Sequence, residues 1–165
     1  MTELLHMQDF DIETCEATIQ SLDTTEDGRI DIQLNKTCFY ARGGGQDWDT
    51  GQITKDSAHF RVDEVRLDEN SQVHHIGSIV EGNFNIGDTV SGMVDRDRRS
   101  TNTRLHSAGH VIDMVISHLG LDWIAGKGQH YPHLSAVEYS GTWLPEQAEE
   151  LKAKIERQAK VVRIL

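Results

Sequence analysis

Two histidines four residues apart are candidate ligands for a metal ion. They are His106 and His110, in the segment His-Ser-Ala-Gly-His. On a helix, residues at this spacing project from one face about one turn apart, so both imidazoles can reach a single ion. A metalloprotease of this type needs glutamate at the second motif position as general base, and Ser107 occupies that position. The pair therefore indicates a metal site without protease chemistry; the alternative is a polar, half-buried helix face.

A run of three glycines is a candidate ligand-binding loop. Gly43, Gly44 and Gly45 stand in the segment T-C-F-Y-A-R-G-G-G-Q, which begins at Thr37 and ends at Gln46. Consecutive glycines tolerate positive φ, and their N–H groups are available to a carbonyl or a phosphate. No Gly-Lys-Ser/Thr follows, so the run is not a phosphate-binding P-loop. The alternative to a binding loop is a bulged hairpin turn after a strand.

The other paired histidines are expected outside this site. His130 and His133 form His-x-x-His beside Pro132. They could approach the helical pair, but the Tyr-Pro between them is typical of a turn, so we predict a surface loop. His74 and His75 are consecutive in a predicted strand and therefore point to opposite faces.

Short strands separated by turn residues are predicted over the first 95 residues. The predicted strands are 17–22, 29–34, 51–53, 60–67, 73–79 and 89–94. The connection at 24–28 ends in Asp-Gly, a pair that favours a hairpin. Several short strands at close spacing predict a small closed or partly closed β-barrel.

Helical periodicity follows the predicted barrel. Apolar residues recur at steps of three and four over 104–119, and Gly120 provides a C-terminal stop. A second helix is predicted after Pro145, with an apolar stripe that reaches Val162. Between the two helices, residues 136–139 are predicted to form a strand.

Charge divides the chain at the same place as the periodicity. The formal net charge is -11, but residues 1–95 hold 19 acidic and 6 basic side chains, whereas residues 96–165 hold 8 and 10. An acidic chain argues against a general nucleic-acid coat protein, because phosphate contacts supply most non-specific affinity. A local basic face is still compatible with this charge. We expect an α+β fold with a β-barrel domain over 1–95 and a two-layer α+β domain over 96–165.

Cysteine use and hydropathy indicate the compartment. Cys15 and Cys38 stand in unrelated contexts, which favours two free thiols in a reducing environment, with the Cys38 side chain in the barrel core. The N-terminus lacks the basic start and apolar run of a signal peptide. No apolar stretch approaches the roughly 18 residues of a membrane span. We therefore expect a soluble, cytoplasmic protein with no membrane partner.

The two motifs together resemble one family. The run T-C-F-Y-A-R-G-G-G-Q-D-W-D-T-G is similar to the T-x-F-Y-P-x-G-G-G-Q-x-x-D-x-G segment of the editing domain of alanyl-tRNA synthetase and its free-standing AlaX-type relatives. The later R-L-H-S-A-G-H-V-I resembles the helix of that family that carries H-S/T-A-x-H. The motifs occur in the same order, and the likeness runs from about Ala17 to the C-terminal helix. Ala41 stands where the family usually has proline.

The resemblance implies a function for the motif residues. It implies a translation-protein-like barrel followed by an editing domain that hydrolyses the ester between a wrong amino acid and alanine tRNA, typically serine or glycine. His106 and His110 would ligate zinc, and Gln46 with residues 43–45 would line the pocket. Thr37 would match the threonine whose hydroxyl helps to recognise serine.

Four arginines in front of the predicted helix are candidate tRNA contacts: Arg96, Arg98, Arg99 and Arg104. On the resemblance, Arg99 and Arg104 are the predicted ligands of acceptor-stem phosphates. The alternative is a solvated turn in which the arginines pair with Asp95 and Asp97.

The chemistry of editing suits these residues. An aminoacyl ester is already activated, so a metal-positioned water and a few donors for the developing oxyanion can suffice without a covalent nucleophile. Serine differs from alanine by one hydroxyl, which a synthetase pocket rejects poorly. A second site that hydrogen-bonds this hydroxyl can select for serine, and the threonine side chain has the required donor and acceptor.

One part of the family pattern is missing. The family completes its metal site with a later Cys-x-x-x-His pair, and this chain has no cysteine after Cys38. Because zinc sites in proteins normally use three or four protein ligands, we expect either a truncated chain or a degenerate member. The alternative functions are a non-catalytic tRNA or aminoacyl-tRNA binding module that keeps the fold, and a different small metal-dependent hydrolase on the same scaffold.

Overall fold

The computed structural model describes residues 1–142 and 144–159 of the 165-residue chain. This part of the chain divides into two compact units. The first, the barrel unit, comprises Met1–Gly43 and Asp47–Arg99. The second, the helix–hairpin unit, comprises Gly44–Gln46 and the chain from Ser100 on. The tip of the glycine run thus groups with the helix rather than with its own neighbours in sequence.

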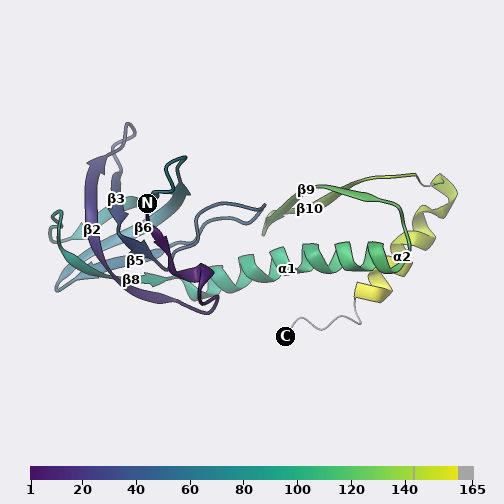
Figure 1. The fold of residues 1–165 in the computed structure, drawn as a ribbon, viewed down its shortest axis with the longest axis horizontal. Coiled ribbons are helices and arrows are strands. Elements are labelled where there is room, and N and C mark those ends of the chain that lie inside the picture. The colour runs from purple at the N-terminus through teal and green to yellow at the C-terminus, as the bar shows by residue number, and fades with distance from the viewer. Residues whose placement is uncertain (143, 160–165) are drawn as a thin grey trace. The chain divides into compact units, whose positions relative to one another are not determined.

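A closed antiparallel barrel forms most of the first unit. Within residues 14–94, six strands close in the order β2-β3-β7-β6-β5-β8 (Figure 1). Their bounds are β2 Thr14–Thr24, β3 Ile30–Leu34, β5 Gly51–Lys55, β6 Ala58–Leu67, β7 Val73–Glu81 and β8 Thr89–Val94. Each contains or overlaps a strand predicted from the sequence. The predicted barrel, and with it the α+β fold class, is confirmed.

Alternation along the strands fills the barrel. On β2, Cys15, Ala17 and Ile19 are buried, whereas Thr14 and Glu16 are exposed. Side chains that are completely inaccessible include Ile19, Ile32, Phe39, Ile53, Phe60, Val65 and Val73. Each such β-branched or aromatic side chain contributes about 1.5–3 kcal/mol by leaving water, so the barrel has its own hydrophobic core.

Short elements complete the barrel unit near the N-terminus. β1 (Glu3–Leu4) pairs in parallel with β4 (Lys36–Thr37), and the 3-10 helix η1 (Leu5–Met7) follows β1. The buried Thr2 hydroxyl donates to the Leu34 carbonyl oxygen at 3.1 Å and accepts the Val73 N–H at 3.0 Å.

The long helix α1 runs from Arg96 to His118 and begins well before the predicted start at Arg104. Asp95 caps it, because its Oδ1 accepts the backbone N–H of Arg98 at 3.1 Å. The first turns carry almost no apolar residues, so periodicity could not detect them. The helix ends as predicted before Gly120, whose φ of 66° suits a glycine at this position.

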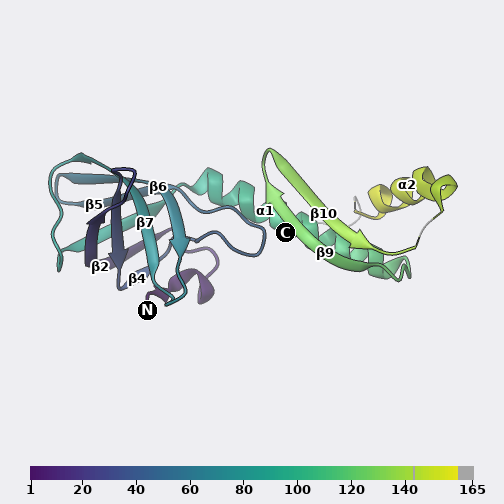
Figure 2. The same cartoon turned by 90° about the horizontal axis from the view of Figure 1, so that it is seen from above.

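A hairpin lies alongside α1 in both views (Figures 1 and 2). It consists of β9 (Ile124–Tyr131) and β10 (Leu134–Ser140), paired antiparallel with Leu134 opposite Tyr131. The predicted strand at 136–139 lies within β10. The pattern did not predict β9, whose residues 124–127 are all exposed.

The second predicted helix follows the hairpin. The 3-10 helix η2 (Pro145–Gln147) leads into α2 (Ala148–Ala159). The part of the predicted stripe that reaches Val162 lies outside the described residues. No helix within 1–142 or 144–159 combines the length and apolar character needed to span a membrane.

The two cysteines are neighbours in the barrel core, which corrects the prediction of unrelated contexts. Both are free and buried, and the Cys38 N–H donates to Sγ of Cys15 at 3.2 Å. The Cys38 thiol, by hydrogen bonding to Cys15, lowers the pKa of Cys15 to about 7 and has its own pKa raised. The predicted core position of the Cys38 side chain is confirmed.

Candidate functional site

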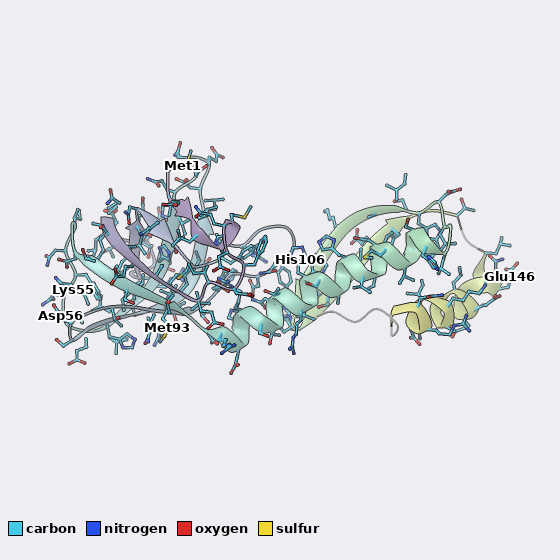
Figure 3. The ribbon with its side chains drawn as sticks, turned by 60° about the horizontal axis from the view of Figure 1, so that its bottom comes forward. Met1, Lys55, Asp56, Met93, His106 and Glu146 are labelled. Carbon is cyan, nitrogen blue, oxygen red and sulfur yellow. The ribbon has the colours of Figure 1, made fainter. Side chains whose placement is uncertain are left out.

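Three imidazoles gather between α1 and the β9–β10 hairpin. His106 and His110 lie one turn apart on α1, with ring centroids 5.0 Å apart. His130 on β9 stacks on His106, with centroids 4.9 Å apart and planes tilted by 12°. His106 accordingly projects from α1 toward the hairpin (Figure 3). The predicted pair shares one helix face, and we call these three residues the histidine cluster.

Gln46, the residue directly after the glycine run, adds a fourth side chain to this cluster. Gln46 is 5% exposed, and its Oε1 lies 2.9 Å from Nδ1 of His106. An amide oxygen only accepts, so Nδ1–H of His106 donates to it. The other ring nitrogen, Nε2, is left as a lone-pair donor. Metal-binding histidines are typically oriented in this way, with one ring N–H given to an oxygen acceptor.

Burial favours the neutral form of two cluster members. The pKa of His106 is lowered from its ordinary value, first by burial and then by the charges of His130 and His110. The pKa of His130 is also lowered, again first by burial and then by His110, with Asp113 opposing. A neutral imidazole is the form that binds a metal. Both rings therefore hold their ligating form near pH 7.

His130 is a site residue that the sequence prediction placed on a surface loop, and that prediction was wrong. It lies on β9 and is 7% exposed. Its ring occupies space left by three glycines. A Cβ at Gly109 would lie 2.2 Å from its Cε1, one at Gly128 would lie 2.8 Å from its Nε2, and one at Gly45 would lie 3.1 Å from its Cδ2. We call these three residues the glycine cradle.

Gly45, the last residue of the glycine run, lies against the backbone of β9. Its φ is +77°, and an added Cβ would lie 2.3 Å from the Gly128 carbonyl oxygen, a backbone atom. Gly45→Ala should therefore lower the free energy of unfolding of the helix–hairpin unit by more than the roughly 1–2 kcal/mol of left-handed strain alone. Chemical denaturation measures this. Gly120→Ala is the matched control, because Gly120 has a φ of +66° and open space around it. Equal losses in the two variants would contradict the predicted clash.

The carboxylate of Asp113 lies next to His110 and is hydrogen-bonded by the phenol of Tyr139. Asp113 Oδ2 lies 3.6 Å from Nδ1 of His110, one turn along α1, and the His110 side chain is 70% exposed. The Tyr139 hydroxyl on β10 donates to Oδ1 of Asp113. Burial, together with this carboxylate, raises the pKa of Tyr139. A β-bulge between Val137 and Tyr139 sets the register that directs this side chain to α1.

The donor set fits part of a zinc site. The ring centroids of His106 and His110 are 5.0 Å apart with planes inclined by 27°, so the two side chains are close enough to be candidate ligands of one ion, which zinc binds through nitrogen at about 2.0–2.1 Å. The orientation of His106 by Gln46 also suits a ligand. However, within the described ranges no three His, Cys, Asp or Glu side chains are already arranged as a metal centre. The described residues therefore supply two candidate donors, not a complete coordination sphere.

Comparison with known proteins identifies the family. The family described as tRNA synthetases class II (A) matches residues 8–98, more than half of the chain. The chain is also 39% identical over 119 residues to the alanyl-tRNA editing protein AlaX-M of Methanosarcina barkeri, covering 70% of this chain and 47% of that protein. The chain belongs to the family of alanyl-tRNA synthetases and AlaX editing proteins.

Two further relatives show how much of a family member the chain represents. It is 40% identical over 94 residues to the mitochondrial alanine–tRNA ligase of Saccharomyces cerevisiae, covering 56% of this chain and 10% of the ligase. It is 33% identical over 140 residues to the alanine–tRNA ligase of Stenotrophomonas maltophilia, covering 84% of this chain and 15% of the ligase. The chain thus spans under half the length of the relatives described here. The match to the S. maltophilia ligase is long enough to include the histidine cluster and residues 37–46.

In this family member, Thr37 is held inside the barrel unit. Its side chain is fully buried, and its hydroxyl lies 2.8 Å from Nε2 of His75. His75 Nδ1 lies 2.9 Å from the Ile32 carbonyl oxygen and must donate to it, so Nε2 accepts the Thr37 proton. Burial lowers the pKa of His75 to about 4, which keeps this acceptor neutral. His74 on the opposite face pairs with Asp31 at 2.6 Å, as alternation predicted.

Arg99 is also engaged within the barrel unit. Its guanidinium pairs with Asp49, which is fully buried, and donates to the Cys38 carbonyl oxygen at 2.7 Å. Its neighbour Arg98 pairs with Asp47 at 2.7 Å. The predicted alternative partners, Asp95 and Asp97, are therefore not the ion-pair partners of these two guanidinium groups. The aspartates that follow the glycine run hold them instead.

The remaining predicted residues lie at the surface or in the loop itself. Arg104 is exposed on α1. Gly43 is half-buried, and its carbonyl oxygen accepts the Tyr40 hydroxyl at 3.0 Å. Gly44 is exposed and has a φ of 54°. Of the predicted site residues in the helix–hairpin unit, the structure thus brings together Gly45, Gln46 and the histidine pair.

Proposed function

We propose that the histidine cluster and Gln46 form the editing site of an aminoacyl-tRNA deacylase. The substrate is a mischarged alanine tRNA that carries serine or glycine on its terminal ribose. The observation that supports this best is the 2.9 Å hydrogen bond from His106 to Gln46, which joins the two sequence motifs at one imidazole. Membership of the family that includes the alanyl-tRNA editing protein AlaX-M supports the same function.

Zinc is the proposed cofactor, and His106 and His110 are its proposed ligands. Polarisation of a carbonyl and activation of a water are the chemistry that zinc supplies in such sites. Gln46 fixes the ring of His106, so that only Nε2 faces outward as a donor. Asp113 lies on the Nδ1 side of His110 and favours the same orientation there. Gln46 thus directs His106 through a hydrogen bond, whereas Asp113, at 3.6 Å, acts on His110 only through its charge.

The glycine run is proposed to admit the ester. Residues 43–45 have no side chains, so the reacting carbonyl can approach the backbone closely, and peptide N–H groups are suitable donors for a developing oxyanion. The Gly45 carbonyl oxygen accepts the His130 N–H at 2.9 Å, which fixes this loop against the hairpin. The loop is therefore positioned before substrate binds, as electrostatic catalysis requires.

The tRNA is the proposed partner, and Arg104 is its proposed phosphate contact. Arg104 is exposed on α1, two residues before His106, whereas Arg99 is committed to Asp49. From residue 100 on, the chain carries seven acidic and seven basic side chains, whereas residues 1–99 carry 20 and 9. The lower negative charge favours contact through the helix–hairpin unit over the acidic barrel unit.

A tRNA-binding module without catalysis is the second candidate. The absence of a preassembled three-ligand centre in the described residues favours it. The two functions differ in one experiment, in which the chain is mixed with alanine tRNA charged with radiolabelled serine, glycine or alanine. Release of serine and glycine well above the spontaneous rate, with alanine spared, supports the deacylase. Retention of the tRNA on the chain without release of any amino acid contradicts it and supports the module.

Thr37→Val tests the proposed recognition of serine. If the hydroxyl contacts the serine side chain, its loss should lower hydrolysis of seryl-tRNA about 5- to 10-fold, the effect of one hydrogen bond of roughly 1 kcal/mol, and spare glycyl-tRNA. The two initial rates are measured side by side, with thermal melting of the variant as control. Equal losses on both substrates would contradict recognition, because they are expected if the variant only disturbs the buried His75.

A further inference from the structure

His130 contacts both sequence motifs at once. Its ring stacks on His106, and its backbone N–H donates to the carbonyl oxygen of Gly45 at 2.9 Å. Gly45 is directly followed by Gln46, the acceptor for Nδ1 of His106. His130 thus packs on the face of the His106 ring. It also fixes the Gly45–Gln46 segment, which binds the edge of that ring through Gln46.

The glycine cradle leaves the His130 ring little freedom. Its Cε1 edge faces Gly109, within the His-Ser-Ala-Gly-His segment itself, and its Nε2 faces Gly128. A side chain at either glycine would overlap the ring, since both Cβ distances fall below 3.0 Å. The glycine inside the helical motif therefore makes room for the His130 ring, which packs against α1 at Gly109 and stacks on His106.

We propose that His130 is a positioning residue that holds the His106 imidazole in its metal-binding orientation. The inference rests on the proposed function. Stacking fixes the plane of the His106 ring, and the bond to Gln46 fixes which nitrogen faces outward. A ligand held by both constraints loses little freedom when an ion binds. Supporting interactions of this kind typically alter metal affinity 10- to 100-fold.

Gly109→Ala tests the proposal without removing any polar group. The added methyl displaces the His130 ring, while alanine is a better helix former than glycine. We expect the affinity of the 165-residue chain for zinc, measured by competition with a chromophoric chelator, to fall about 10- to 100-fold. Gly126→Ala is the control on β9, because its Cβ would meet the Glu138 carbonyl oxygen at 3.3 Å, a tight contact that a shift of a few tenths of an ångström relieves and that does not involve His130.

His130→Ala is the second variant and should reproduce this loss. For both variants, the imidazole resonances of His106 in the metal-free chain should shift and broaden, and circular dichroism should show an intact fold. Unchanged zinc affinity and unchanged His106 resonances in both variants would overturn the proposal. So would a loss of affinity in His130→Ala alone, because that result makes His130 itself a ligand.

The imidazole resonances of His106 test the positioning role of His130 independently of the proposed deacylase function. A chain that neither binds zinc nor releases serine refutes the proposed function. The His106 resonances of that same chain still report whether His130 and the glycine cradle set the ring orientation.

Discussion

Replacing Arg99 with alanine is expected to lower the free energy of unfolding by about 3–5 kcal/mol, the cost of leaving a buried charge without its partner. Asp49 is fully buried, and its carboxylate accepts Nε of Arg99 at 2.9–3.0 Å and the Tyr40 N–H at 2.6 Å. The variant removes the guanidinium but leaves the carboxylate in the protein interior. Urea denaturation monitored by tryptophan fluorescence measures the loss.

Arg96→Ala is the matched control for this prediction. Arg96 begins the same helix, but its side chain is 79% exposed and pairs at 3.1 Å with a partly exposed Glu13. Exposed pairs of this kind contribute about 0–1 kcal/mol. The double variant Asp49→Leu with Arg99→Leu should recover part of the stability lost in Arg99→Ala, because no isolated charge then remains. Losses of similar size in Arg96→Ala and Arg99→Ala would contradict the buried-pair assignment.

The second large effect is expected at His110. His110→Ala should remove bound zinc and lower the rate of seryl-tRNA hydrolysis at least 100-fold, because two of the proposed donors become one and a single imidazole cannot hold the ion. The fold should survive, since the His110 side chain is 70% exposed. Elemental analysis and the deacylation assay, run on the same preparation, measure both quantities.

His118→Ala is the control for His110→Ala. His118 is an exposed histidine near the end of the same helix, outside the cluster. The His118→Ala variant should therefore retain both bound zinc and the rate of seryl-tRNA hydrolysis. Unchanged zinc content in His110→Ala would remove this residue from the site.

The barrel could be predicted from sequence because its signals are local. Strands β2, β6 and β8 alternate buried and more exposed residues over much of their length, and each signal lies within a few neighbouring positions. The start of α1 could not be predicted in this way. Its first turns depend on the cap by Asp95 and on ion pairs with Asp47 and Asp49, which are distant in sequence. Strand β9 was missed because its first residues are exposed and so carry no alternation.

The candidate site, like the fold, could be predicted only where its signals are local in sequence. The spacing of His106 and His110 needs only helical geometry, so sequence suffices to place them together. His130 depends on the register of β9 with β10 and on contact with Gly109, and neither is encoded in a short motif. The engagement of Thr37 by His75 and the proximity of Cys15 to Cys38 likewise depend on barrel closure.

The most direct test of zinc-dependent editing is a zinc titration of the metal-free 165-residue chain, with release of serine from seryl-tRNA for alanine measured at each step. The rate of serine release should rise with bound zinc and reach a plateau near one ion per chain. In His106→Ala it should stay at the spontaneous level at every step. Serine release that is independent of zinc, or a chain that binds zinc and tRNA but releases no serine, would contradict zinc-dependent editing.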